Sequence, residues 1–211
     1  GEGIEVGSVV VNDDVAVENS TWTTGRRGIA GTIFVHKIAG AKAEAGGNLE
    51  EVKAVAEKVI ANVRSMGMAL TPCIVPAAGK PGFQLAEDEV EIGMGIHGEP
   101  GTHREAIRPA SETAAHLTQK VMDDLGLKSG DEVTVLINGL GGTPMMELMI
   151  INKTVAEMLG KAGVRTHRTL VGEYMTSLEM AGCSVTILRL DEELKALLDA
   201  PAETPAFRQG Q

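Results

Sequence analysis

The chain has 211 residues, of which 43% are hydrophobic and 23% are charged, and its formal net charge is −10. This acidic balance argues against a protein that binds phosphate backbones, because nucleic-acid affinity depends on clustered Lys and Arg, and no apolar run approaches the ~18 residues that a membrane span needs. Gly is frequent, at 26 residues, and aromatic residues make up only 2%, which favours an α/β protein with many tight strand-to-helix turns.

The first third of the chain predicts one buried strand followed by two helices. Residues 4–12 are β-branched and nearly continuous, which is typical of a strand buried on both faces. Residues 29–46 contain many small side chains and predict a helix that ends at a Gly pair. Asn48 is a suitable N-cap with Glu51 three residues later, so residues 48–67 predict a second helix.

The centre of the chain predicts irregular structure, a strand and a helix. Three prolines within residues 68–83 exclude a regular helix and indicate extended segments and turns. Apolar residues then alternate with Glu or Gly from Glu89 to Ile96, which indicates a half-buried strand. Residues 110–126 predict a helix, with Ser111 as its cap and Gly126 as its terminator.

The last third alternates strand and helix patterns. We expect a strand within residues 130–144, which end in a Gly-rich turn, and further strands over 166–171 and 182–190. We expect helices over 145–163 and 191–201. Together the elements predict an α/β fold with a mixed sheet and flanking helices, in two or three layers. Cys73 and Cys183 lie in apolar runs without metal-binding spacing, so we expect buried, reduced thiols.

Three polar motifs have both a binding and a structural interpretation, and we favour the structural one for each. NGLGGTP, residues 138–144, is either an anion cradle before a helix or a tight turn. The arginines of TTGRRG, residues 23–28, either grip a carboxylate or phosphate or form salt bridges. NDDVAVE, residues 12–18, argues against a single metal site, because adjacent Asp side chains point to opposite sides of a strand.

His97 is the strongest candidate for a functional side chain. The expected strand leads directly to it, and Gly95, Gly98 and Gly101 remove side-chain bulk around it, so a small ligand can come close to the ring. An imidazole there can act as a base, a metal ligand or a nucleophile, and zinc is disfavoured because only His103 is near. The other histidines are interpreted as structural or surface residues: His36, His116 and His167.

Long stretches of the chain resemble the K subunit of dihydroxyacetone kinase. They are VVVNDDVAV, TTGRRGIAGTIFVHKIAGAKAEAGG, CIVPAAGKPGFQLAEDEVEIGMGIHGEPG, LINGLGGTPMMELMI and VGEYMTSLEMAGCSVTILRLDEEL, in order over almost the whole chain. The resemblance implies that His97 attacks the carbonyl carbon of dihydroxyacetone and forms a covalent hemiaminal, with Gly95, Gly98 and Glu99 as substrate-binding residues. It implies a phosphotransferase with an alcohol acceptor, which phosphorylates a terminal hydroxyl to give dihydroxyacetone phosphate.

The chain departs from the K-subunit pattern at its N-terminal side. The family carries a GGGSGHEP-type loop and an Asp there, which bind the substrate hydroxyls, and neither is found in this sequence. We therefore interpret residues 1–67 as the remainder of an incomplete first lobe and residues 68–211 as a second α/β lobe that carries His97. We expect this fragment alone to lack efficient phosphoryl transfer.

The resemblance also implies partners. Nucleotide and Mg²⁺ are expected on a separate L subunit, so no cofactor is expected on this chain, and the ending near TPAF favours the phosphotransferase system over ATP as the phosphoryl source. We expect a homodimer of K subunits in the cytoplasm, with neither nucleic acid nor membrane as a partner. The alternative function is a non-catalytic ligand sensor, which binds the ketone and activates a transcription regulator.

Overall fold

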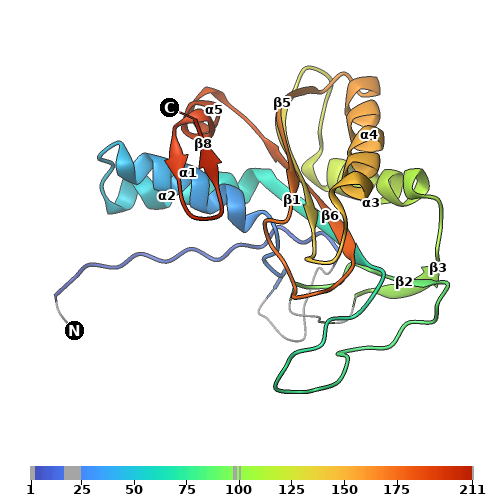
Figure 1. The fold of residues 1–211 in the computed structure, drawn as a ribbon. Coiled ribbons are helices and arrows are strands. Elements are labelled where there is room, and N and C mark those ends of the chain that lie inside the picture. The colour runs from blue at the N-terminus through green and yellow to red at the C-terminus, as the bar shows by residue number, and fades with distance from the viewer. Residues whose placement is uncertain (1–2, 17–24, 97–98, 100, 211) are drawn as a thin grey trace.

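The computed structural model describes residues 3–16, 25–96, 99 and 101–210 (Figure 1). Six strands form one sheet in the order β3-β2-β1-β6-β4-β5. These strands are β1 (Val63–Ala69), β2 (Glu89–Ile92), β3 (His103–Ala106), β4 (Glu132–Gly139), β5 (Arg165–Gly172) and β6 (Gly182–Arg189). Only β4 and β5 pair in parallel, and the other neighbours are antiparallel. The mixed sheet expected from the sequence is therefore confirmed.

In the described part of the chain, five helices flank the sheet, and a short hairpin follows them. The helices are α1 (Thr32–Glu44), α2 (Leu49–Asn62), α3 (Ala110–Leu125), α4 (Met145–Lys161) and α5 (Glu192–Asp199). The hairpin consists of β7 (Ala202–Glu203) and β8 (Arg208–Gln209). Four of the helices, α1, α3, α4 and α5, match the predicted helices over nearly their whole length. The fifth, α2, ends five residues before the predicted end at residue 67.

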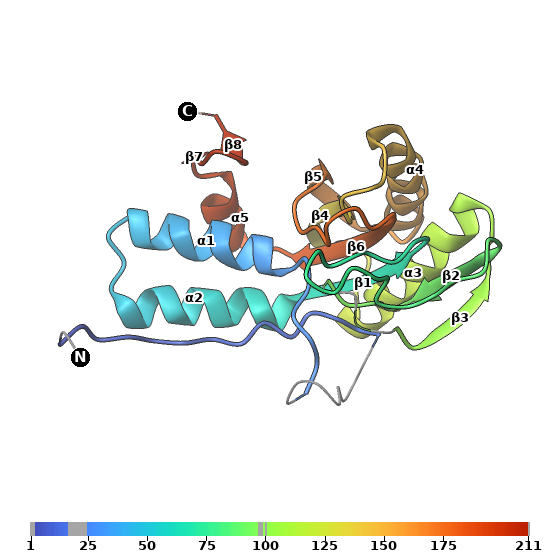
Figure 2. The same ribbon diagram turned by 60° about the horizontal axis from the view of Figure 1, so that its bottom comes forward.

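The two faces of the sheet are covered by different helices, which makes three layers (Figure 2). On one face, α3 and α4 pack against alternate residues of the central strands, among them Val185 and Ile187 of β6. On the other face, Leu136 and Leu188 pack against a cluster from α1, α2 and α5 that includes Phe34. Because strand side chains alternate between faces, the same strands serve both cores.

Two of the helix boundaries follow from local capping chemistry. The Asn48 side chain accepts a hydrogen bond from the Glu51 N–H at 3.0 Å, and the Glu51 carboxylate accepts one from the Asn48 N–H at 2.9 Å, so the expected capping box is present. Gly126 ends α3 in the left-handed conformation, with φ of 59°. The prediction of Ser111 as a cap is wrong, because the N-cap of α3 is Pro109, which offers no side-chain hydrogen bond.

The predicted strand over residues 4–12 is wrong for the described chain. These residues are extended but belong to no strand, and Ile4, Val6 and Val10 are 73%, 82% and 76% exposed. The segment runs beside α2 (Figure 2), where a Cβ on Gly7 would lie 3.3 Å from Leu49. A strand needs a neighbouring strand to bond with its backbone. The described residues provide no such neighbour for residues 4–12, and the first bridge comes just after them, between Asp14 and Ser65.

The predicted helix over residues 48–67 is also wrong in its last five residues. The chain leaves the helix at Val63, whose φ of −112° and ψ of 138° are extended, and continues as β1. All seven residues from Val63 to Ala69 pair in an unbroken register with β6, so tertiary pairing overrides the helical pattern at this end. The boundary proposed between the two lobes, after residue 67, falls inside β1, and the division into lobes stays a prediction.

No helix in the described part of the chain is long and apolar enough to cross a bilayer.

Candidate functional site

The candidate site is the loop of residues 93–101, here called the histidine loop, which follows β2. His97 and Gly98 lie outside the described residues, so their predicted roles stay predictions. Gly95 and Glu99 are described, and the Gly95 N–H donates to the Glu99 carbonyl at 3.2 Å. This bond closes the loop across the position of His97 in the sequence.

Gly95 has a steric reason to be glycine. A Cβ at this position would overlap the carboxylate of Glu99 and would lie 3.1 Å from Nη1 of Arg27. The sequence analysis interprets the missing side chain of Gly95 as room for a ligand. In the structure the carboxylate of Glu99 uses this space. Glu99 accordingly lies at the loop with its charged end against the backbone of Gly95.

Both ends of the histidine loop are tied to the sheet. At the first end, the Gly93 N–H donates to the Gly67 carbonyl at 2.7 Å, and Gly93 has a φ of 73° that favours glycine. At the second end, the Gly101 N–H donates to the buried Glu91 carboxylate at 2.8 Å. Glu91 also accepts from Arg104 of β3 at 2.9 Å. The alternating pattern of a half-buried strand puts Glu91 on the polar face, but in the structure it is only 4% exposed and is paired with Arg104.

A buried ion pair lies beside the first end of the loop. Arg27 donates to Asp14 Oδ2 through Nε at 2.9 Å and through Nη2 at 2.7 Å, and its Nη2 also donates to the Gly93 carbonyl at 2.5 Å. Asp14 further accepts from the Ala16 N–H at 2.9 Å. Burial raises the pKa of Asp14 to about 6, against the opposing effect of the Arg27 charge. The structure thus joins two motifs, residues 12–18 and 23–28, that the sequence leaves separate.

Asp13 has a different partner from its neighbour. Its carboxylate accepts from the Ile29 and Gly31 N–H groups, both at 2.7 Å, just before α1 begins. Burial raises its pKa. The two adjacent carboxylates therefore bind different groups. Within the described residues no cluster of three His, Cys, Asp or Glu side chains is arranged to hold a metal ion.

Arg26 forms the surface salt bridge that the structural interpretation of its motif predicts. It donates to both carboxylate oxygens of Asp124, at 2.8 Å and 2.6 Å, and Arg64 donates to the same carboxylate at 2.5 Å. The two arginines lower the pKa of Asp124. Adjacent arginines in one motif thus serve a surface pair and a buried pair.

The Gly-rich turn after β4 is occupied by a carboxylate of the chain itself. The Gly141 N–H donates to Glu173 at 2.8 Å, and burial raises the pKa of Glu173. The Thr143 hydroxyl donates to the Gly182 carbonyl at 2.6 Å, and the Gly182 N–H donates to that hydroxyl at 2.8 Å. These contacts support the interpretation as a tight turn.

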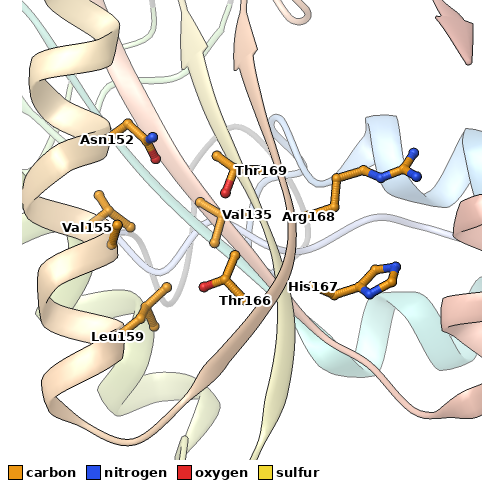
Figure 3. A pocket seen from close by; sticks show the side chains of 9 residues that line it. Val135, Asn152, Val155, Leu159, Thr166, His167, Arg168 and Thr169 are labelled. Carbon is orange, nitrogen blue, oxygen red and sulfur yellow. The ribbon is translucent and has the colours of Figure 1, made fainter.

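Two hollows lie away from these groups. A groove of about 300 Å³ separates α4 from β5, at the opposite edge of the sheet from β2 and β3. Figure 3 shows Asn152 of α4 facing Thr166 and Thr169, while His167 and Arg168 point away from α4. A second, mainly apolar cavity of about 280 Å³ lies between the starts of α3 and α4. Neither is lined by the described residues of the histidine loop.

The other histidines lie outside the candidate site. His167 contacts Asp199 at 2.8 Å and Glu132 at 3.5 Å, which supports a structural interpretation. His36 is exposed on α1, and His116 is half-buried on α3. His103 opens β3, a strand that the sequence pattern does not predict, and its ring contacts Thr102 at 3.0 Å.

Comparison with known proteins gives consistent matches. A family model described as the Dak1 domain matches residues 1–206. A protein of Listeria innocua named "PTS-dependent dihydroxyacetone kinase 1, dihydroxyacetone-binding subunit DhaK" is 55% identical over 207 residues, which cover 98% of this chain and 63% of that protein. The chain thus spans less than two thirds of the length of this relative.

Solved structures also match over nearly the whole chain. "Dihydroxyacetone kinase operon co-activator Dha-DhaQ" superposes with a TM-score of 0.91 at 35% identity and covers 100% of this chain and 65% of that one. The dihydroxyacetone kinase of C. freundii superposes with a TM-score of 0.85 at 31% identity and covers 98% of this chain and 37% of that one.

Proposed function

Because the chain belongs to the Dak1 domain family, we propose that it binds dihydroxyacetone as the substrate-holding subunit of a dihydroxyacetone kinase. The observation that carries this proposal is the 55% identity to a dihydroxyacetone-binding subunit over 98% of the chain. The histidine loop supports it, since Gly93, Gly95 and Glu99 are held by backbone and buried polar contacts beside the position of His97.

In this proposal His97 is the nucleophile. The unprotonated imidazole nitrogen forms a bond to C2 of the ketone, and the π electron pair of the C=O bond moves to the oxygen. That oxygen takes up a proton and the second ring nitrogen releases one, so the product is a neutral hemiaminal. Glycerol has no carbonyl and cannot react in this way, so the step selects short ketones and fixes the terminal hydroxyl for phosphorylation.

The remaining parts of the proposal concern the substrate contacts and partners. Gly95 and Gly98 give the ketone room, and Glu99 accepts hydrogen bonds from its hydroxyl groups. A separate L subunit supplies the phosphoryl group with its nucleotide and Mg²⁺, and the phosphotransferase system, which the name of the Listeria relative includes, recharges it in the cytoplasm. A homodimer of substrate-holding subunits completes the assembly.

The test is capture of dihydroxyacetone labelled with ¹³C at C2. We expect the carbonyl resonance to be replaced by a tetrahedral carbon resonance in the presence of the protein, and His97→Ala to abolish this change. His103→Ala is the matched control, because His103 lies six positions further along on an exposed strand. An adduct that survives His97→Ala would refute the assignment of the nucleophile.

A second candidate function is ligand sensing without phosphoryl transfer. It is favoured by the similarity to the co-activator of a dihydroxyacetone kinase operon, with its TM-score of 0.91. A turnover assay with an L subunit and a phosphoryl donor separates the two functions. A kinase subunit forms dihydroxyacetone phosphate, whereas a sensor captures the ketone and forms no product.

A further inference from the structure

We propose that Arg27 is the positioning residue of the histidine loop, and that Asp14 orients Arg27 for this task. The inference rests on the proposed function, because it concerns how His97 is presented to a ketone. It assigns a role to two motifs that precede the loop by about 70 to 80 residues in the sequence.

The contacts of Arg27 converge on the loop. Its Nη2 donates to the Gly93 carbonyl at 2.5 Å, at the first residue of the loop. Its Nη1 lies 3.1 Å from the position that a Cβ on Gly95 would occupy, and the Glu99 carboxylate lies at that same position. The guanidinium therefore lies against residues on both sides of His97 in the sequence.

Asp14 fixes the direction of the guanidinium. The Asp14 side chain is fully buried, and that of Arg27 is 6% exposed. Nε and Nη2 both contact the same oxygen of the Asp14 carboxylate, which fixes the plane of the guanidinium. In this orientation Nη2 also donates to the Gly93 carbonyl. A lysine would supply the charge, but its three N–H donors lie on one nitrogen, so it cannot reproduce the contacts that Nε and Nη2 make from separate positions.

The ion pair is itself anchored to the centre of the sheet. The Val15 N–H donates to the Ser65 carbonyl at 2.9 Å, and the Ser65 N–H donates to the Asp13 carbonyl at 2.7 Å. Ser65 lies in β1, which pairs with both β2 and β6. Arg27 and Asp14 thus connect the loop to a strand that has a paired neighbour on each side, and such support holds a reacting group in position.

Arg27→Lys and Asp14→Asn test this inference, with Arg26→Lys as the matched control. Arg26 is the adjacent arginine, and it binds Asp124 at the surface. Two quantities are measured: the dissociation constant of the ¹³C-dihydroxyacetone adduct, and amide hydrogen exchange of the peptide that covers residues 93–96 compared with a β4 peptide.

We expect Arg27→Lys to weaken the adduct by about a hundredfold, because small displacements of a reacting group have effects of that order. Exchange of the loop peptide accelerates while β4 keeps its protection. Asp14→Asn changes both quantities in the same direction, and Arg26→Lys leaves both near the wild-type values. Wild-type adduct affinity and loop exchange in Arg27→Lys would overturn the inference.

If Arg27→Lys also exposes β4 to exchange, Gly95→Ala decides the question. This variant retains both Asp14 and Arg27, and its added methyl group displaces the Glu99 carboxylate and crowds the guanidinium at the loop. Because Gly95 also gives the ketone room, the deciding readout in this variant is exchange: faster exchange of the loop peptide with β4 still protected supports positioning, and unchanged loop exchange overturns it. If the wild type forms no adduct, the proposed function fails, while the exchange of the loop peptide still tests the contact between Arg27 and the loop.

Discussion

Replacing Asn138 by alanine is expected to destabilise the fold strongly. This fully buried side chain at the end of β4 makes four hydrogen bonds. Its amide nitrogen donates to the Met175 carbonyl at 2.9 Å and to the Ser184 hydroxyl at 3.3 Å. Its amide oxygen accepts from the Tyr174 and Met175 N–H groups at 2.9 Å and 2.8 Å. One side chain thus joins β4, β6 and the segment after β5.

The size of the effect follows from these bonds. A typical hydrogen bond contributes about 1 kcal/mol net, and a buried group left without a partner costs about 1–3 kcal/mol. Four bonds, with three backbone groups among the partners, give a loss of about 4 kcal/mol in the free energy of unfolding. For a chain of this size that corresponds to a fall in melting temperature of about 10 °C.

Asn62→Ala provides the matched control. The Asn62 side chain donates a hydrogen bond to the Lys58 carbonyl at 2.9 Å in the last turns of α2. We expect its loss to cost about 1 kcal/mol or less. Urea unfolding followed by circular dichroism measures both variants, with the m-value checked to be unchanged. Equal losses for Asn138→Ala and Asn62→Ala would refute the reasoning that a multiply bonded buried amide holds this turn.

Three further predictions concern single groups. Because burial raises the pKa of Asp14 from an ordinary value of 3.8 to about 6, its stabilising contribution is complete below pH 3.8 and is lost as the pH rises through 6. Urea midpoints from pH 3.5 to 7 should show this decline, and it should be smaller in Asp14→Asn, where the raised pKa of Asp13 still contributes; equal slopes would contradict the prediction. Gly95→Ala should lower stability by about 1–3 kcal/mol through overlap with a neighbouring carboxylate, whereas Gly40→Ala, at an exposed position of α1 with open space around it, should raise it by up to about 1 kcal/mol. Thermal melts that rank these glycines in the reverse order would argue against the packing described. Cys183, buried and with its pKa raised to about 12 by burial, should resist iodoacetamide in the native protein and react in urea, and rapid native alkylation seen by mass spectrometry would contradict its burial.

The sequence predicts well those elements whose signals are local. The capping box at Asn48 and Glu51 depends on residues three apart, and it places the start of α2 correctly. Gly126 at the end of α3 and the Gly-rich turn before α4 are similarly local, because they depend on φ values and caps that nearby residues determine. The sequence also singles out the histidine loop through its cluster of glycines.

Elements that depend on distant partners are predicted less well. Residues 63–67 are predicted as the end of a helix but belong to β1, because β6 and β2 are available on either side. Residues 4–12 have the composition of a buried strand yet bond to no strand of the described chain. In both cases backbone hydrogen bonds to other segments decide the outcome, and a local pattern carries no information on them.

By itself, the sequence determined the fold class, the order of most helices and strands, and the family resemblance that points to His97. Only the tertiary structure decided that Asp14 and Arg27 meet at Gly93, that Glu99 fills the space beside Gly95, and that Glu91 is buried and bound to Arg104. The physical reason is that charges and hydrogen-bond donors select their partners in space. Along the chain, Arg27 is 13 residues from Asp14 and 66 from Gly93, and Glu91 is 13 residues from Arg104.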